Sequence, residues 1–591
     1  MKSFIKYTAA TVLGIFLCSI IMGVISIIAV AGMAASENMT KPISEPSVLH
    51  LKLNGNLLER QEDNPFAMLS GEEIQDISLE EALIAIDKAK NNEQIKGIYI
   101  EAGALAGTPA MMQELRNALL DFKNSGKFIL AYGETYSKGA YYLASTADEV
   151  LLNPIGMLDW SGMASMPLFF KDVMEKLGMK MQVFKVGTYK SAVEPFIATE
   201  MSPANREQVS SYLNSIWKNM VKDVAASRNL KPEAVNALAD SLTALAKPEV
   251  SLKGGLVDKL CYISEVKTIL KEKAGFGEDD DINLVTPKDV ANAETLQEKI
   301  SDEIAVYYAY GDIVQSRPNS SPFQQEGIIC GEDVTIDLQK LREDDDVKAV
   351  VIRVNSGGGS AFASEQIWHE VKLLKEKKPV VISMGGMAAS GGYYISCEGN
   401  LIFAEPTTLT GSIGIFGMVP DASELLTNKI GLKYDVVKTN ALSDFGASLL
   451  RPFNDIECQT MQKHVNEGYE LFTTRVADGR KMKQDDVKKI AEGRVWTGEQ
   501  ALEIGLVDKL GDLDEAIVAA AELAKCDKYC TGRYPAPAPW YEGLFEQTKA
   551  NYLNSQMKGF MGEYYPMLNI MQQFKELDHV QARIPYFINI R

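Results

Sequence analysis

The sequence of 591 residues predicts an α/β protein made of two tandem copies of one unit. One observation is self-similarity at an offset of 252 residues, at which IKGIYI (95–100) resembles VKAVVI (347–352). A repeat of this length indicates a duplicated domain. The second is that, in each copy, short apolar β-rich runs alternate with helical patterns. Strands buried on both faces and linked by helices favour parallel βαβ units with right-handed crossovers.

The predicted elements follow the same order in both copies. In the first they are a strand IKGIYIEA at 95–102, a helix around Ala110 to Lys123, a strand KFILAYG at 127–133, a helix after Lys138 and a strand DEVLLN at 148–153. In the second they are VKAVVIRV at 347–354, a helix around Ala363 to Lys375, PVVISMG at 379–385, a helix from Ser390 and NLIFAE at 400–405. GLVDKL then recurs identically near the end of each copy, at 255–260 and 505–510.

These patterns divide the chain into five parts. We expect an N-terminal segment at 1–40, a first repeat at 45–270, a polar, acid-rich connector at 271–300, a second repeat at 301–525 and a tail at 526–591. The tail is rich in aromatic residues and methionine. It is expected either to contact a membrane or another subunit or to pack on its own domain.

The N-terminal segment has the pattern of a membrane anchor. No charged residue occurs from Tyr7 to Ser36, a stretch longer than the ~20 residues that span a bilayer core. Its apolar run is longer than the core of a typical signal peptide, which favours an uncleaved anchor, although Ala29 to Ala31 resemble a cleavage site. Two lysines precede the span and Glu37 is the first charge after it, so the N-terminus is predicted to be cytoplasmic and the rest extracytoplasmic.

The amino-acid composition indicates which partners and cofactors the protein can bind. Hydrophobic residues make up 46% and charged residues 24%, which is typical of a chain that mostly folds in water. The formal net charge of −19 argues against nucleic acid, because a phosphate polymer requires a basic surface. Seven scattered cysteines give no disulfide framework, and four scattered histidines give no zinc spacing, so we expect neither a metal nor a cofactor.

Two Gly-rich turns in the second copy follow neighbouring predicted strands, at 355–360 and 385–392. Ligands of open α/β sheets bind at this end of the strands. Ser390 opens a predicted helix, beside the positive end of the helix dipole. Glycine lets the backbone approach a ligand closely, so the amides of Gly358 and Gly391 are candidates to stabilise an oxyanion.

A serine hydroxyl is a weak nucleophile and needs a base. The four histidines lie in neither Gly-rich turn. A lysine can act instead if burial lowers its pKa from about 10.4, since a low-dielectric environment disfavours the charged form.

Several motifs together resemble one family. They are MAASGGYYIS at 387–396 after an NS-x-GGS turn, TGSIGIFG at 410–417, VGTYKSAVEPF at 186–196, and VWTG at 495–498 followed by GLVDKLGD. This combination, spread over nearly all of residues 45–525, resembles signal peptide peptidase A in its long two-repeat form, a family of Ser-Lys peptidases. The resemblance implies two tandem Clp/crotonase-like domains, with Ser390 as the nucleophile, Lys190 as the general base and Ser412 orienting the lysine. For Ser412, capping of a turn is an equal alternative.

The alignment of the two copies places Lys190 in the first copy and Ser390 in the second. Lys138 of the first copy aligns with Ser390, and Leu442 of the second aligns with Lys190. Neither copy therefore holds both groups, and we expect the site to form where the copies meet.

The resemblance implies a membrane-anchored serine endopeptidase that degrades cleaved signal peptides through an acyl-enzyme. It would lie in the bacterial inner membrane, with its catalytic domains in the periplasm and with peptides as substrates. Fold-mates that assemble as rings imply a homo-oligomer. The alternatives are acyl-CoA chemistry of the crotonase type and a non-catalytic membrane-bound scaffold or regulator.

Overall fold

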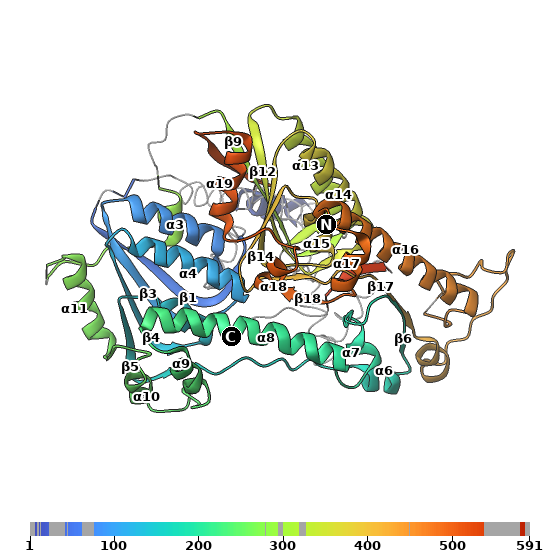
Figure 1. Cartoon of the computed structure of the whole chain (residues 1–591), viewed down its shortest axis with the longest axis horizontal. Helices are drawn as coiled ribbons and strands as arrows, with labels where there is room; N and C mark the ends of the chain where they lie inside the picture. Colours follow the sequence, from blue (N-terminus) through green and yellow to red (C-terminus); the bar gives the residue numbers. More distant parts are fainter. Residues whose placement is uncertain are drawn as a thin grey trace.

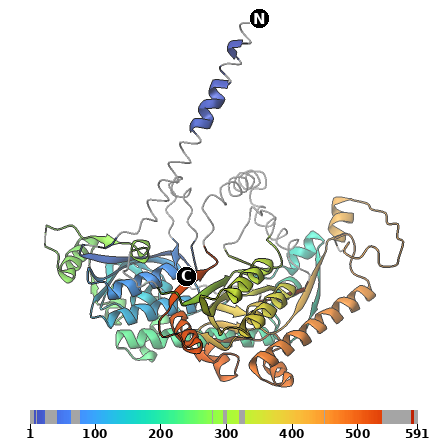
Figure 2. The ribbon, with the colours of Figure 1, turned by 90° about the horizontal axis from the view of Figure 1, so that it is seen from above.

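The computed structural model shows two α/β units side by side (Figures 1 and 2). It describes residues 6–8, 11, 13–22, 42–43, 45–61, 76–277, 279–293, 300–317, 327–447, 449–536 and 580–584. Each unit is built around a mainly parallel sheet, so the predicted α/β class and the duplication are confirmed.

The first unit has the strand order β2-β1-β3-β4-β5-β7, with β8 paired to β1. All its pairs are parallel. Its strands are β1 (Ser47–Leu58), β2 (Ile77–Ser78), β3 (Ile95–Ala106), β4 (Phe128–Tyr136), β5 (Glu149–Leu158), β7 (Lys259–Leu260) and β8 (Leu284–Val285). Its helices are α3 (Leu79–Asn91), α4 (Pro109–Lys123), α5 (Lys138–Ala144), α6 (Lys171–Leu177), α7 (Glu194–Ile197), α8 (Pro203–Arg228), α9 (Pro232–Ala239), α10 (Pro248–Lys253), α11 (Ile263–Ala274) and α12 (Pro287–Ala291).

The second unit has the order β18-β16-β14-β12-β9-β20, with β15 and β19 branching from β14. Only β16 and β18 pair antiparallel in this described sheet. Its strands are β9 (Glu303–Tyr310), β12 (Val347–Ser356), β14 (Val380–Ala389), β15 (Leu401–Ala404), β16 (Leu409–Gly411), β18 (Val495–Thr497), β19 (Lys509–Leu510) and β20 (Cys530–Tyr534). Its helices are α13 (Gly331–Glu343), α14 (Ala361–Lys375), α15 (Gly391–Ser396), the π-helix η1 (Leu425–Ile430), α16 (Asp455–Arg480), α17 (Gln484–Ile490), α18 (Gly498–Glu503) and α19 (Leu513–Ala524).

A third sheet joins the two copies. Its order is β11-β10-β13-β21-β17-β6, and β6 comes from the first copy whereas the other strands follow residue 300. β6 pairs antiparallel with β17 over six residues. The strands are β6 (Lys180–Lys185), β10 (Asp312–Val314), β11 (Ile328–Cys330), β13 (Gly358–Ser360), β17 (Phe416–Asp421) and β21 (Val580–Arg583).

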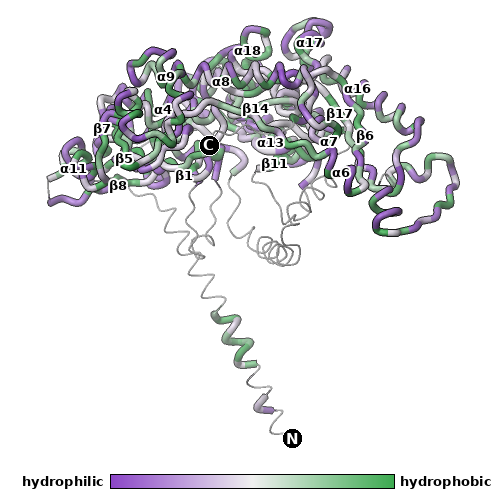
Figure 3. Tube along the Cα trace, turned by 90° about the horizontal axis from the view of Figure 1, so that it is seen from below, coloured by the Kyte–Doolittle hydropathy of each residue, from purple (hydrophilic) through white to green (hydrophobic). Residues whose placement is uncertain are grey.

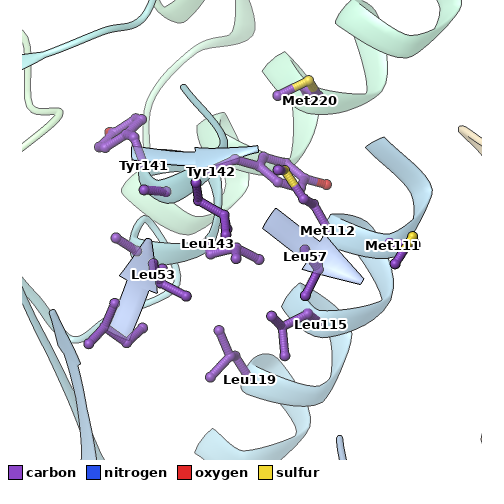
Figure 4. Packing of buried hydrophobic residues seen from close by; sticks show 14 of the residues in the cluster. Leu53, Leu57, Met111, Met112, Leu115, Leu119, Tyr141, Tyr142, Leu143 and Met220 are labelled. Atoms are coloured by element: carbon purple, nitrogen blue, oxygen red, sulfur yellow. The ribbon is translucent and has the colours of Figure 1, made fainter. Parts of the chain in front are cut away.

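The cores of the two copies repeat the same contacts. In the first copy, leucines of β1 and α4 pack with the tyrosines of α5 (Figure 4). The hydroxyl of Tyr141 donates to the carbonyl oxygen of Leu256 at 2.9 Å, and Tyr393 donates to Leu506 at the same distance. Because Leu256 and Leu506 belong to the two GLVDKL segments, these buried tyrosines hold α5 and α15 to the equivalent segments that lead into β7 and β19.

The copies share a continuous apolar interface. Met387, Ala389 and Val495 of the second copy belong to the hydrophobic cluster of the first. Figure 1 shows the long helix α8 running beneath both units, and it packs on β18 of the second. Apolar burial of this kind is the main favourable term in association, so it holds the two halves of the chain in one orientation.

A buried ionic cluster lies in the same interface. Arg353 of β12 donates to Glu59 and to Glu114 at 2.5 Å each and to the hydroxyl of Ser383 at 3.0 Å. All three charged side chains are at most 4% exposed. The single cation of the second copy thus lies against two acidic side chains of the first, and burial raises the pKa of Glu114 to about 7.

The predicted membrane span lies largely outside the described residues. Residues 13–22 form an exposed, hydrophobic helix that stands away from the two units (Figures 2 and 3). Within the described parts of the chain, the structure holds no helix with the length and hydropathy needed to cross a bilayer. The anchor at 1–40 therefore stays a prediction.

We predict that Arg353→Met destabilises the protein by about 3–5 kcal/mol, because it leaves buried carboxylates without their cation. Denaturant unfolding of the full chain measures the change. The matched control is Lys340→Met, since Lys340 is 71% exposed in its ion pair with Asp337 and exposed pairs contribute little. Equal midpoints for the two variants would contradict the assignment.

Candidate active site

Ser390 occupies a sharp turn between β14 and α15. Its φ is 56° and its ψ is −114°, an unusual conformation for a residue with a side chain. Its amide donates to the carbonyl oxygen of Gly411 at 2.8 Å, and its side chain is fully buried. A strained strand-to-helix turn of this kind presents a hydroxyl at the end of a sheet.

Lys190 reaches this serine from the other copy. The chain leaves β6 and brings the Lys190 amine to 2.7 Å from the hydroxyl of Ser390. The lysine is 1% exposed. Burial lowers the pKa of the Lys190 amine well below its ordinary value. The two residues meet within one chain, and the amine is in the environment that a neutral base requires.

Ser412 makes the second contact with the amine. Its hydroxyl and its carbonyl oxygen both lie 3.2 Å from the Lys190 nitrogen. Ser412 has a φ of 48°, and its amide donates to the carbonyl oxygen of Arg494 at 2.7 Å. It is therefore held by the segment that follows α17, and it fixes the direction from which the amine approaches Ser390.

Two glycines that our sequence reasoning did not assign to the site make room for the lysine. A β-carbon on Gly493 would lie 2.7 Å from the Lys190 α-carbon, and one on Gly414 would lie 3.3 Å from its δ-carbon. Gly493 also has a φ of 78°. In the sequence, Gly493 lies two residues before the VWTG motif. Its role could not be inferred there because Lys190, the residue it contacts, lies about 300 residues away.

A network from α8 supports the loop that carries Lys190. The Gln208 amide group donates to the Tyr189 carbonyl oxygen and to the Ser191 hydroxyl at 3.0 Å, and its oxygen accepts from the Val495 amide at 3.2 Å. One buried side chain thus fixes the residues on both sides of the lysine and ties them to β18. Sequence reasoning missed Gln208.

The predicted oxyanion glycines lie next to each other. A β-carbon on Gly358, whose φ is 99°, would be 2.7 Å from the Gly391 nitrogen. The Gly358 amide donates to the hydroxyl of Ser356 at 3.1 Å. The structure therefore brings together all five predicted residues: Ser390, Lys190, Ser412, Gly358 and Gly391.

The residues that align with Ser390 and Lys190 in the opposite copy, Lys138 and Leu442, do not form a second pair of this kind within the described structure. Lys138 begins α5 and is half-buried, and burial lowers its pKa. Leu442 is exposed in the segment after η1. The described structure thus has one lysine–serine contact of this kind, formed between the copies.

A buried amine against a serine at the end of an α/β sheet is the architecture of a serine protease, and sequence comparisons agree. The profile of peptidase family S49 matches residues 121–277 and 372–527, once in each copy, and that of Clp protease matches 329–407. The chain belongs to peptidase family S49, and the resemblance to signal peptide peptidase A is confirmed.

The similarity to known proteins extends along most of the chain. Protease 4 of Salmonella typhi is 39% identical over 78% of this chain and 74% of its own length. Protease 4 of Haemophilus influenzae is 35% identical over 85% and 83%. A chloroplastic serine protease SPPA of Arabidopsis thaliana is 33% identical over 74% and 64%. The matches favour a serine protease over an acyl-CoA enzyme or a scaffold.

We predict that Gly493→Ala separates Lys190 from Ser390, because the added β-carbon meets the lysine backbone. Peptide hydrolysis by the variant should fall well below that of Gly505→Ala. Gly505 has a φ of 79°, almost that of Gly493, but a β-carbon there meets nothing within 4 Å. Equal rates would show that backbone strain alone, and not the contact with Lys190, is responsible.

Proposed function

We propose that this protein is an endopeptidase that uses Ser390 as the nucleophile and Lys190 as the general base. The observation that carries the proposal is the 2.7 Å contact between a buried amine and a hydroxyl, both in the positions that the family motifs specify. A lysine that is neutral before substrate arrives can take the serine proton, as general-base catalysis requires.

The reaction proceeds through an acyl-enzyme. Lys190 accepts the hydroxyl proton while the Ser390 oxygen attacks the substrate carbonyl carbon, and the Gly358 and Gly391 amides stabilise the oxyanion. The lysinium then protonates the leaving amine, and the peptide C–N bond breaks. In the second half-reaction Lys190 takes a proton from water, which hydrolyses the ester. Ser412 keeps the amine directed at Ser390 through both steps.

We propose cleaved signal peptides as the substrates and the extracytoplasmic face of the membrane as the location. The family resemblance supports the substrate class. The uncharged stretch from Tyr7 to Ser36 supports an anchor, with the cytoplasmic N-terminus that its flanking charges predict. An anchor would keep the site beside apolar peptides that remain in the bilayer.

We also propose that the protein is a homo-oligomer. Exposed apolar side chains support an interface, and they gather in two segments at 164–168 and 432–437. Met166 is 86% exposed and Val437 is 98% exposed. Apolar surface of this kind is typical of a contact between proteins.

We predict that Ser390→Ala and Lys190→Ala each lower kcat/KM for peptide hydrolysis by about 10⁴-fold or more, because the two groups act as a unit. The matched control is Lys138→Ala, which removes the lysine at the position aligned with Ser390 in the first copy. It should keep the wild-type rate. Labelling by a serine-reactive acylating probe should be lost in the first two variants and retained in the third. An active Lys190→Ala variant would disprove the assigned base.

We predict that kcat/KM rises with pH along one acidic limb and then levels off. Below its pKa the Lys190 amine is protonated and cannot accept the serine proton, so the rate increases by about tenfold per pH unit until the amine is neutral. Since burial lowers this pKa, the plateau should begin well below pH 10. If kcat/KM instead levels off only near the ordinary pKa of lysine, the amine is exposed to solvent and the assigned environment is wrong.

A further inference from the structure

The loop that carries Lys190 lies against a loop of the second copy that follows α17. The amide of Tyr189 donates to the carbonyl oxygen of Glu492 at 3.0 Å, and the amide of Thr188 donates to the carboxylate of Glu492 at 3.3 Å. A β-carbon on Gly187 would stand 2.4 Å from the carbonyl carbon of Glu492, so the two backbones touch. The residues just before the lysine are therefore held by the second copy.

The side chain of Arg494 lies between two aromatic rings in this loop. Its guanidinium carbon is 4.7 Å from the centre of the Tyr189 ring and 4.4 Å from the centre of the Trp496 ring. The guanidinium group donates to the Tyr189 hydroxyl at 3.1 Å and forms an ion pair with Glu207 of α8, also at 3.1 Å. The Tyr189 hydroxyl donates to the same carboxylate at 3.2 Å. A planar cation can stack and donate in this way at once, so it fixes the tyrosine next to the base.

The backbone of Arg494 holds the other residue that contacts the amine. Its carbonyl oxygen accepts a hydrogen bond from the amide of Ser412 at 2.7 Å. Trp496 packs on Gly411, where an added β-carbon would stand 2.8 Å from the indole ring. The carbonyl oxygen of Gly411 in turn accepts from the amide of Ser390 at 2.8 Å. One residue is thus connected to the neighbour of the base and to the serine that orients it.

The aligned positions of the first copy have a different composition. An offset of 250 residues aligns α10 with α18 and one GLVDKL segment with the other. At this offset Arg494 aligns with Ala244, and Trp496 aligns with Ala246. At these positions only the copy that faces Lys190 has an arginine and a tryptophan, so the pair is not a requirement of the shared fold.

We propose that Arg494 is a positioning residue for the reaction of Ser390 and Lys190. It fixes the approach of the amine through Tyr189 on one side and through Ser412 on the other. This inference rests on the proposed function of the site. The amine lies at the end of a long side chain and must stay 2.7 Å from the serine hydroxyl, which requires that both of these supports keep their places.

The variant Arg494→Lys tests the proposal, because it keeps the positive charge but loses the planar group that stacks on both rings. With the full chain and a fluorogenic peptide, kcat should fall by about tenfold or more, since displacement of a positioned group lowers the rate of the chemical step. KM should stay nearly unchanged, because substrate binding is not affected. The acidic limb of kcat/KM should move to higher pH, since water that reaches a displaced amine raises its pKa towards the ordinary value.

The matched control is Arg475→Lys on α16. The Arg475 guanidinium group lies 4.0 Å over the ring of Trp368 and pairs with Glu365 at 2.6 Å. Its side chain is 25% exposed, compared with 22% for Arg494. This control should keep the wild-type rate and the wild-type acidic limb. Denaturant unfolding of both variants measures the fraction that is folded in each assay.

Variants of Tyr189 test the path from the arginine to the base. Tyr189→Ala removes the ring and should reproduce the loss of kcat and the shift of the acidic limb. Tyr189→Phe keeps the ring that stacks on Arg494 and should be clearly more active than Tyr189→Ala. The double variant Arg494→Lys/Tyr189→Ala should be no less active than Tyr189→Ala alone, because both changes remove the same interaction.

The outcomes separate this proposal from the function on which it rests. An Arg494→Lys variant with the kcat and the acidic limb of Arg475→Lys overturns the positioning role. A loss of activity that follows the folded fraction while the limb stays in place also overturns it, and so do losses that multiply in the double variant. A folded wild type that neither hydrolyses the peptide nor reacts with the serine-reactive probe defeats the proposed function itself.

Discussion

Removal of the Lys190 amine from water is the constraint on which the rest of the structure depends. An amine that is to be neutral must be desolvated without a carboxylate beside it, because a negative charge would restore its proton. The site meets this condition with a serine hydroxyl, a second serine and the close backbone of Gly493 and Gly414. The groups that surround the amine come from both copies, and the interface between the copies is apolar and contains a buried ionic cluster.

Duplication followed by divergence accounts for the asymmetry of the molecule. Both copies keep the parallel sheet and the buried tyrosine that contacts the GLVDKL segment, because these features hold each fold together. The proposed chemistry is divided between the copies: the first contributes the segment after β6, which carries Lys190, and the second contributes the turn after β14, which carries Ser390. Pairing of β6 with β17 brings them together. The proposed site therefore needs both copies, since each copy alone holds only one of the two residues.

Much of this organisation was predictable from the sequence because it follows local patterns. The repeat and the alternation of apolar runs predicted strands β3, β4, β5, β12, β14 and β15 and helices α4 and α14 within a few residues. The Gly-rich turns and family motifs predicted the five residues that the structure brings together. Gln208, Gly493 and Gly414 could not be found in this way, since their role depends on packing between distant segments. β21 is only four residues long, and its apolar–polar alternation is too short to stand out within the tail, so its partners β13 and β17 define it as a strand.

The pairing of β6 with β17 also orders events during synthesis of the chain. β6 ends at Lys185 and β17 begins at Phe416, so the ribosome must add the connector and most of the second sheet before these strands can meet. Until then the lysine has no hydroxyl partner and remains hydrated and protonated. A nascent chain that ends before β17 therefore cannot bring the Lys190 amine to Ser390 as the folded chain does, and this contact must wait until residues 416–421 have been added.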